Sequence, residues 1–229
     1  MVEALPPIPR IAALLADPAR ASIVWMLIDG TTRPAGELAH AARISAQSAS
    51  GHLAKLVDGG LLGCEAQGRH RYFRIAGPEV AAMLESMAFV GAARSRAPRA
   101  ALPPATPVGF LYARTCYGHL AGEMAVDVLA GMLKARWLVA QGNDYDLTAQ
   151  GRRRLAALGV DVDAARQARR TFARACVDLT QRRPHLGGAL GDALLGMYVE
   201  QGWIVRSRRS RAVQITPRGH EGFRREFGL

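Results

Sequence analysis

RISAQSASGHLAKLVDGGLLGCEAQGRHRYFRI, residues 43–75, is the stretch that decides the fold of the first half of this chain. Ser45 is a favourable helix N-cap, and the apolar residues after it recur at helical spacing, so the pattern predicts a helix that ends at Gly59. A predicted hairpin with a basic tip follows. A helix and a basic hairpin in this order are typical of the recognition helix and wing that a winged helix-turn-helix places on DNA.

The predicted helix has two different faces. Its apolar face is expected to pack inward and consists of Ala49, Leu53, Leu56 and Val57. Its opposite face carries Gln47, Ser48, Gly51 and Lys55. Gln47 and Ser48 fall in the first turn, which meets base edges in such helices, so they are the candidate base-reading residues. An ordinary core helix followed by a surface hairpin is the alternative interpretation of this stretch.

The remaining candidate DNA contacts lie around this face. Phosphate contacts are expected from Ser45, Lys55, Arg69 and Arg71, and a minor-groove contact is expected from His70. Gly51 costs about 1 kcal/mol in a helix interior relative to alanine. A glycine there indicates either a close approach to DNA or a site that is not optimised for helix stability.

The flanking sequence predicts more helices. Asp17-Pro18 is a helix start, and that helix should run to Gly30. Further helices are expected at residues 8–15, 31–42 and 78–93. The expected order is three helices, the recognition helix, a two-stranded wing and a last helix.

Residues 8–93 resemble the ArsR/SmtB family of bacterial winged-helix repressors. The resemblance is carried by LLADPARASIVWML, by ISAQSASGHLAKLVDGGLL and by GRHRYFRI. It implies that the helices Ile8–Leu15 and Pro78–Ala93 build a symmetric homodimer that binds an inverted-repeat operator in double-stranded DNA. The family usually has two histidines before the leucine of the recognition helix. Here Gly51 replaces the first, and His52 is expected to touch a phosphate or to pack against the wing.

Composition and charge set limits on the class of protein. A length of 229 residues allows one large or two modest domains. No signal peptide and no membrane-spanning run are evident, and three widely spaced cysteines favour a reduced, cytoplasmic compartment. The net charge is +11, but residues 1–95 hold nine basic against eight acidic residues. The excess lies in residues 96–229, which either attract DNA or reflect a coding bias towards arginine.

We predict an N-terminal winged helix-turn-helix domain at residues 1–95, a proline-rich linker at 96–107 and a C-terminal domain at 108–229. The C-terminal domain contains an internal repeat, at about residues 120–159 and 188–227, in which equivalent threonines and glycines lie 68 residues apart. Each repeat has the pattern helix, strand, turn, strand, helix. The fold class is therefore mainly α with small β-wings (α+β), with two winged-helix-like repeats in the C-terminal domain.

Two segments of the C-terminal domain resemble a subset of the same family that carries an extra C-terminal region. They are RTCYGHLAG at 114–122 and ARACVDLTQRRPHLGGALG at 173–191. The subset has Asp in place of Gly118 and Trp in place of Leu179. The matching cysteines and histidines form the candidate effector site: Cys116, His119, Cys176 and His185.

Thiolate and imidazole suit a soft metal ion or a thiol-reactive effector. The alternative is that both cysteines are small buried residues. We expect Cys116, His119 and Glu123 to share one helical face, and we interpret Cys64 as a packing residue.

Other classes of site are not evident. The thiolate and histidine metal sites best known in the family have no equivalent in GELAHAARI or in PEVAAMLESMAFVGAA. No cofactor loop and no catalytic set can be located, so no enzyme activity is expected. The sequence predicts a transcriptional regulator, a dimeric repressor that an unknown signal releases from its operator. The alternative, favoured by the near-neutral residues 1–95 and by Gly51, is a winged-helix protein-interaction module without sequence-specific DNA binding.

Overall fold

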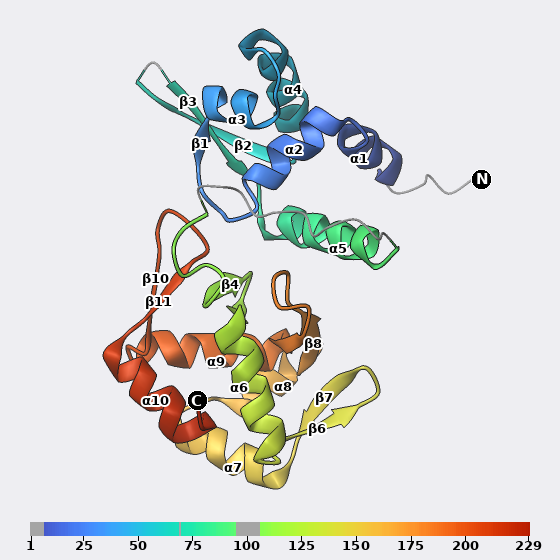
Figure 1. Ribbon diagram of the computed structural model, residues 1–229. Helices are drawn as coiled ribbons and strands as arrows, with labels where there is room; N and C mark the ends of the chain where they lie inside the picture. Colours follow the sequence, from blue (N-terminus) through green and yellow to red (C-terminus); the bar gives the residue numbers. More distant parts are fainter. Residues whose placement is uncertain (1–6, 69, 95–105) are drawn as a thin grey trace, which may run out of the picture. The chain divides into compact units, whose positions relative to one another are not determined.

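The structure is a computed structural model that describes residues 7–68, 70–94 and 106–229. The chain divides after Thr106 into two compact units, an N-terminal and a C-terminal one, and each is described by itself (Figure 1). Both units combine helices with small antiparallel sheets. The predicted α+β fold class is therefore confirmed.

The N-terminal unit consists of helices around a three-stranded sheet of order β1-β3-β2. Its elements are α1 (Ile8–Leu15), α2 (Pro18–Met26), β1 (Arg33–Pro34), α3 (Ala35–Ala41), α4 (Ala46–Asp58), β2 (Leu62–Gln67), β3 (His70–Ile75) and α5 (Pro78–Arg94). The strands β2 and β3 form the predicted wing, with Gln67 paired to His70 at its tip. Side chains from the helices and from the wing form the core, among them Ile23, Leu27, Leu38, Leu53, Leu56, Leu61 and Phe73.

Two helix starts in this unit are capped as the sequence predicts. The Asp17 carboxylate accepts a hydrogen bond from the backbone N–H of Arg20, at 2.9 Å. The Ser45 hydroxyl accepts one from the N–H of Ser48, at 3.1 Å. Because each cap satisfies an N–H that the helix leaves without a partner, it fixes where α2 and α4 begin.

The segment between α2 and α3 differs from the prediction. We expected one helix to reach Gly30 and another to begin at Thr31, but α2 ends at Met26 and the short strand β1 precedes α3. The cause is the buried Asp29, which accepts hydrogen bonds from the backbone and hydroxyl of Thr31 and from the Arg33 guanidinium. These bonds hold a turn, and the chain then joins the edge of the wing sheet.

The C-terminal unit repeats the order hairpin, helix, hairpin, helix. The first copy contains β4 (Arg114–Cys116), β5 (His119–Ala121), α6 (Glu123–Lys134), β6 (Leu138–Gln141), β7 (Asp144–Leu147) and α7 (Ala149–Ala157). The second contains β8 (Arg174–Val177), β9 (Pro184–Gly187), α9 (Gly188–Glu200), β10 (Ile204–Arg206), β11 (Val213–Ile215) and α10 (Pro217–Phe227). The helix α8 (Val162–Gln167) lies between the copies.

The repeated threonines and glycines have the same structural role in both copies. Thr148 caps α7 by accepting from the N–H of Gly151, and Thr216 caps α10 by accepting from the N–H of Gly219, each at 2.9 Å. A Cβ at either glycine would collide with the carbonyl oxygen of a buried tryptophan, Trp137 or Trp203. The repeated glycines thus mark a close contact between a helix start and the residue that precedes the first strand of the hairpin, β6 or β10.

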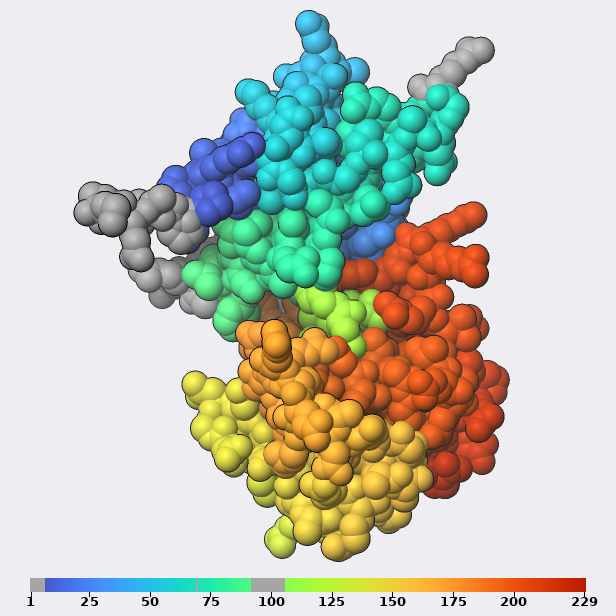
Figure 2. All heavy atoms as spheres, turned by 180° about the vertical axis from the view of Figure 1, so that it is seen from behind, coloured from blue at the N-terminus to red at the C-terminus, as the bar shows by residue number. Residues whose placement is uncertain are grey.

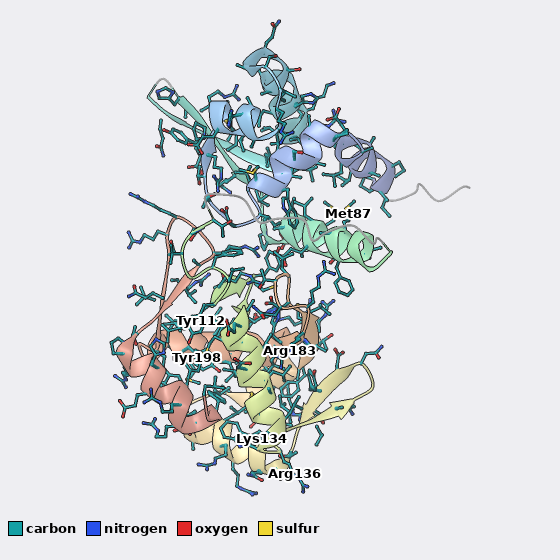
Figure 3. All side chains as sticks on the ribbon, viewed as in Figure 1. Met87, Tyr112, Lys134, Arg136, Arg183 and Tyr198 are labelled. Atoms are coloured by element: carbon teal, nitrogen blue, oxygen red, sulfur yellow. The ribbon has the colours of Figure 1, made fainter. Side chains whose placement is uncertain are left out.

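The two copies are packed into each other. The helix α6 of the first copy packs on β9 of the second, and α9 of the second packs on β5 of the first. One apolar core includes both, and Tyr198 lies within it against Trp203 and Phe223 (Figure 3). The strand β5 of the first copy also contacts β9 of the second, so the first hairpins of the two copies lie side by side.

Among the helices of the described residues, none combines the length and the apolar character that a membrane span requires.

Candidate functional site

The helix α4 presents a polar face to solvent, as the sequence predicts. Its apolar side chains Ala49, Leu53 and Leu56 are buried. The opposite face is exposed, and we call it the reading face: Gln47, Ser48, Gly51 and Lys55. A Cβ added to Gly51 would meet no atom within 4 Å. The unit itself therefore does not require a glycine at this position.

The wing beside this helix exposes basic side chains. His70 and Arg71 are both exposed at the start of β3. Arg71 donates from Nε to the sulfur of Cys64 at 3.4 Å, and its guanidinium lies 5.7 Å from the Phe73 ring centre. These contacts hold the arginine stem against the wing. The candidate contact Arg69 lies outside the described residues.

His52 lies on the flank of α4, half-buried beside the start of α2. Its Nδ1 is 3.8 Å from the Asp17 carboxylate and 3.5 Å from the Arg20 guanidinium. The ring is thus held near the α2 N-cap, and its Nδ1 points at side chains of that helix rather than of the wing.

The first and last helices of the N-terminal unit leave apolar side chains in solvent. None of the residues of α1 is buried, and Ile8 is 67 % exposed. On α5, Met87 is 49 %, Phe89 43 % and Val90 60 % exposed (Figure 3 labels Met87). Contiguous exposed apolar patches are typical of surfaces that bind a partner.

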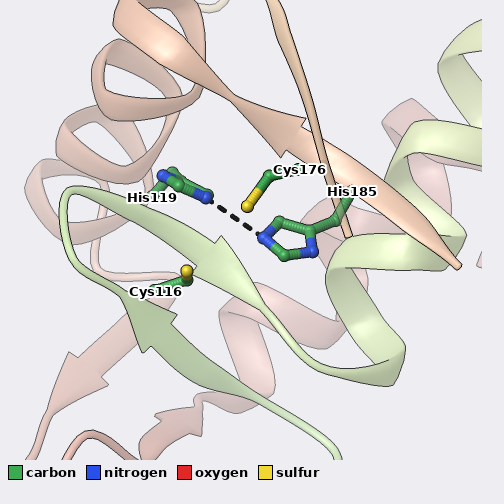
Figure 4. Close-up of side chains that lie close together, drawn as sticks. All are labelled: Cys116, His119, Cys176 and His185. Atoms are coloured by element: carbon green, nitrogen blue, oxygen red, sulfur yellow. Dashed lines mark hydrogen bonds between the residues drawn. The ribbon is translucent and has the colours of Figure 1, made fainter. Parts of the chain in front are cut away.

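A second group of functional side chains lies in the C-terminal unit, and we call it the Cys/His cluster: Cys116, His119, Cys176 and His185 (Figure 4). Their ligand atoms all lie within 4.8 Å of one another. The two imidazoles face each other, with 3.1 Å between their Nε2 atoms. Cys116, His119 and His185 are buried, and Cys176 is half-buried. The structure therefore brings together all four residues of the candidate effector site.

Each hairpin supplies one cysteine opposite one histidine. Cys116 pairs with His119 across β4 and β5, and Cys176 pairs with His185 across β8 and β9. The predicted helical face with Glu123 is wrong, because Glu123 is the first residue of α6 and is exposed. The segment is extended because its backbone is bonded to a distant segment just before β11: the N–H of Thr115 donates to the carbonyl of Arg211, at 2.8 Å.

The protein groups around Cys116 favour the protonated form of its thiol. A hydrogen bond with Cys176 and burial raise the pKa of Cys116 to about 11, although the neighbouring histidines oppose that shift.

Glycines let the backbone approach the cluster closely. A Cβ at Gly187 would lie 3.1 Å from the His119 ring, and one at Gly191 would lie 3.0 Å from the His119 Cβ.

A buried ion pair supports the cluster. The Arg114 guanidinium donates to the Asp178 carboxylate at 2.8 Å, and both side chains are at most 1 % exposed. The other carboxylate oxygen accepts from the N–H of Gly122 at 2.7 Å and lies 3.5 Å from Nδ1 of His185. Burial alone would raise the pKa of Asp178. The charge of Arg114 and the hydrogen bonds from the backbone N–H of Gln181 and Gly122 together lower it by more, so the pKa lies well below its usual range.

Sequence reasoning missed Arg114 and Asp178. Each lies within a segment that carries a Cys–His pair, but an arginine and an aspartate 64 residues apart give no pairing signal in one sequence. The one indication in the sequence was the charged Arg114 in a segment that is otherwise apolar or small, because a buried charge needs a partner.

Comparison with known proteins supports the helix-turn-helix fold of the N-terminal unit and finds a relative over nearly the whole chain. Residues 15–64 match the model of a helix-turn-helix domain family. Over 228 residues, which are 98 % of both chains, the protein is 37 % identical to an uncharacterized HTH-type transcriptional regulator, YdfF, of Bacillus subtilis (strain 168).

Two solved structures are similar to part of the chain. One is the homodimeric winged helix-turn-helix DNA-binding domain Mb0332 from Mycobacterium bovis, with 26 % identity, 41 % of this chain and 87 % of that chain covered, and a TM-score of 0.36. The other is reduced HlyU from Vibrio cholerae N16961, with 26 % identity, 36 % and 86 % covered, and a TM-score of 0.34.

Proposed function

The chain belongs to the HTH-type transcriptional regulators, and we propose that it is a homodimeric repressor of the ArsR/SmtB type that binds an inverted-repeat operator. The observation that carries this proposal is the reading face of α4. It is exposed and polar, and it lies on a helix whose opposite face is fixed in the core. Such a helix fits the major groove, which admits an α-helix.

The roles within this face follow from its chemistry. Gln47 and Ser48, in the first turn of α4, read base edges, because a glutamine can bond in a bidentate manner to adenine. Ser45, Lys55 and Arg71 hold phosphates, together with Arg69, and His70 enters the minor groove. His52 holds Asp17 and the start of α2, or reaches a phosphate next to that helix. Phosphate contacts position the protein, whereas base contacts specify the sequence.

The dimer is proposed from the exposed apolar side chains of α1 and α5. Two copies that pack through these helices would cover Ile8, Met87 and Val90. Two recognition helices related by a two-fold axis read two half-sites about one helical turn, roughly 10 base pairs, apart or a multiple of this. The C-terminal unit would hold the sensor, and a signal there would release the operator.

The test is footprinting on the DNA upstream of the protein's own gene, with light scattering of the free protein. We expect a protected inverted repeat and twice the 24.6 kDa mass of one chain. Val90→Glu should give monomers, whereas Val139→Glu, at an apolar residue of β6 that is 47 % exposed, should leave the dimer intact.

Protection that does not exceed protection of random DNA would contradict the repressor proposal. It would favour the protein-interaction module instead. A monomeric wild-type chain would remove the dimer.

A further inference from the structure

We propose that the Cys/His cluster is a tetrahedral binding site for one Zn²⁺ ion per chain, held between the two repeats of the C-terminal unit. The proposal concerns this unit alone. It does not rest on DNA binding, and its test does not use DNA.

The donor set matches zinc in kind and in number. Two sulfurs and two imidazole nitrogens lie within 4.8 Å of one another. An S₂N₂ set in a tetrahedral arrangement is typical of zinc. Two thiolates and Zn²⁺ sum to zero charge, so the filled site suits a buried position, where an uncompensated charge would be costly.

The distances are close to those of a filled site. Zn–N bonds of about 2.0–2.1 Å and tetrahedral angles place two nitrogen ligands about 3.3 Å apart. The Nε2 atoms of His119 and His185 are 3.1 Å apart. Two zinc-bound sulfurs lie about 3.8 Å apart by the same geometry, within the 4.8 Å limit of the cluster, so side-chain adjustments are enough to bind the ion.

The surroundings of His185 match those of a metal ligand. Its Nδ1 is buried, makes no hydrogen bond among the described residues and lies 3.5 Å from the Asp178 carboxylate, the long limit of such a bond. A metal on Nε2 puts the proton of this ring on Nδ1, facing that carboxylate. Histidine ligands commonly donate this proton to a carboxylate, which orients the ring. Arg114 and Gly122 in turn hold Asp178.

The position of the cluster indicates what the ion does. Each repeat contributes one cysteine and one histidine from equivalent hairpins, and the helix of each repeat packs on the hairpin of the other. Four protein ligands leave no open position for a substrate, which distinguishes structural sites from catalytic ones. The bound ion therefore joins the two repeats and stabilises this unit.

A disulfide between Cys116 and Cys176 is the competing use of the same sulfurs. It would need only the two thiols. A disulfide would leave the two buried imidazoles of His119 and His185 facing each other with no ligand, whereas a metal ion binds all four groups. The half-buried Cys176 gives the ion a path into the site.

The test is a Co²⁺ titration of the reduced, chelator-treated full-length protein. Tetrahedral thiolate-bound Co²⁺ absorbs in the visible range. We expect this absorption to saturate at one equivalent per chain and to disappear when Zn²⁺ is added. No visible absorption, or binding that does not saturate near one equivalent, would overturn the proposal.

Variants locate the site. Cys116→Ser and Cys176→Ser should weaken metal binding by more than the ~10–100-fold that loss of a second-shell partner costs. The matched control is Cys64→Ser, which removes the cysteine of the wing strand β2 and should bind like the wild type. Equal weakening in Cys64→Ser would overturn the assignment to the cluster.

Alkylation of the wild-type protein keeps the test independent of how the variants fold. Zn²⁺ should slow the modification of Cys176 and leave that of Cys64 unchanged, as measured by peptide mass spectrometry. Equal rates at Cys176 with and without Zn²⁺ would overturn the proposal. A second result would also overturn it: the reduced protein binds no metal, and on oxidation it readily forms a Cys116–Cys176 disulfide.

Discussion

The two units each bury an arginine–aspartate ion pair, but the two pairs differ greatly in how far apart their residues are in the sequence. Arg33 reaches Asp29 four residues away, at 2.9 Å, and fixes a local turn. Arg114 reaches Asp178 64 residues away, at 2.8 Å, and ties one repeat to the other. The N-terminal unit thus builds its functional face from one contiguous segment, whereas the C-terminal unit has its Cys/His cluster only when both repeats are folded together.

The largest expected effect comes from breaking either pair. Arg114→Leu leaves the Asp178 carboxylate buried without its charge partner, and Arg33→Leu does the same to Asp29. Each should cost about 3–5 kcal/mol of the stability of its own unit. Hydrogen exchange read by mass spectrometry should show faster exchange in β4–α10 for Arg114→Leu and in α2–α5 for Arg33→Leu.

The same pair of variants tests whether the contrast between the units is real. Arg114→Leu should also weaken Co²⁺ binding, whereas Arg33→Leu should not. If either variant accelerated exchange in both units, the units would not be independent, and the comparison would fail.

A smaller effect is expected on the reading face. Gln47→Ala should remove about 1–3 kcal/mol of preference for the operator over random DNA, because it loses a base contact. Competition binding with both DNAs measures this. Ser22→Ala, an exposed hydroxyl on α2, is the control and should change neither affinity. An equal loss on both DNAs for Gln47→Ala would assign Gln47 to the phosphates.

Gly51 separates helix stability from DNA contact. Since a Cβ there meets no atom of the unit, Gly51→Ala should stabilise the N-terminal unit by about 1 kcal/mol, as measured by denaturant unfolding. If the helix backbone approaches DNA closely, the same change should weaken operator binding. A more stable protein with unchanged affinity would show that the glycine is simply not optimised for helix stability.

The smallest effect compares the two basic hairpins. Arg71 lies on the wing of the N-terminal unit, and Arg209 is exposed at the tip between β10 and β11, which stands out from the C-terminal unit (Figure 2). Arg71→Ala should reduce the slope of log affinity against log salt by about 0.9, the value for one phosphate. Arg209→Ala should leave the slope unchanged. A reduced slope for Arg209→Ala would place the second hairpin on DNA as well.

Elements that depend only on neighbouring residues could be predicted from the sequence. Asp17 and Ser45 each precede a predicted helix as capping residues, and the structure has both caps. The two faces of α4 were also predictable, because a helix places residues three and four apart on one side. These features follow from short-range geometry and need no knowledge of the rest of the chain.

How distant segments meet depends on long-range contacts that the sequence pattern does not show. The prediction of a helix at Cys116 failed because contacts with residues 211–213 hold that segment extended, and no local pattern encodes them. The strand β1 and the ion pair of Arg114 with Asp178 were missed for the same reason. The sequence identified the cysteines and histidines as a candidate set. Their convergence required the two repeats to pack against each other, since each hairpin alone brings only two of the four donors.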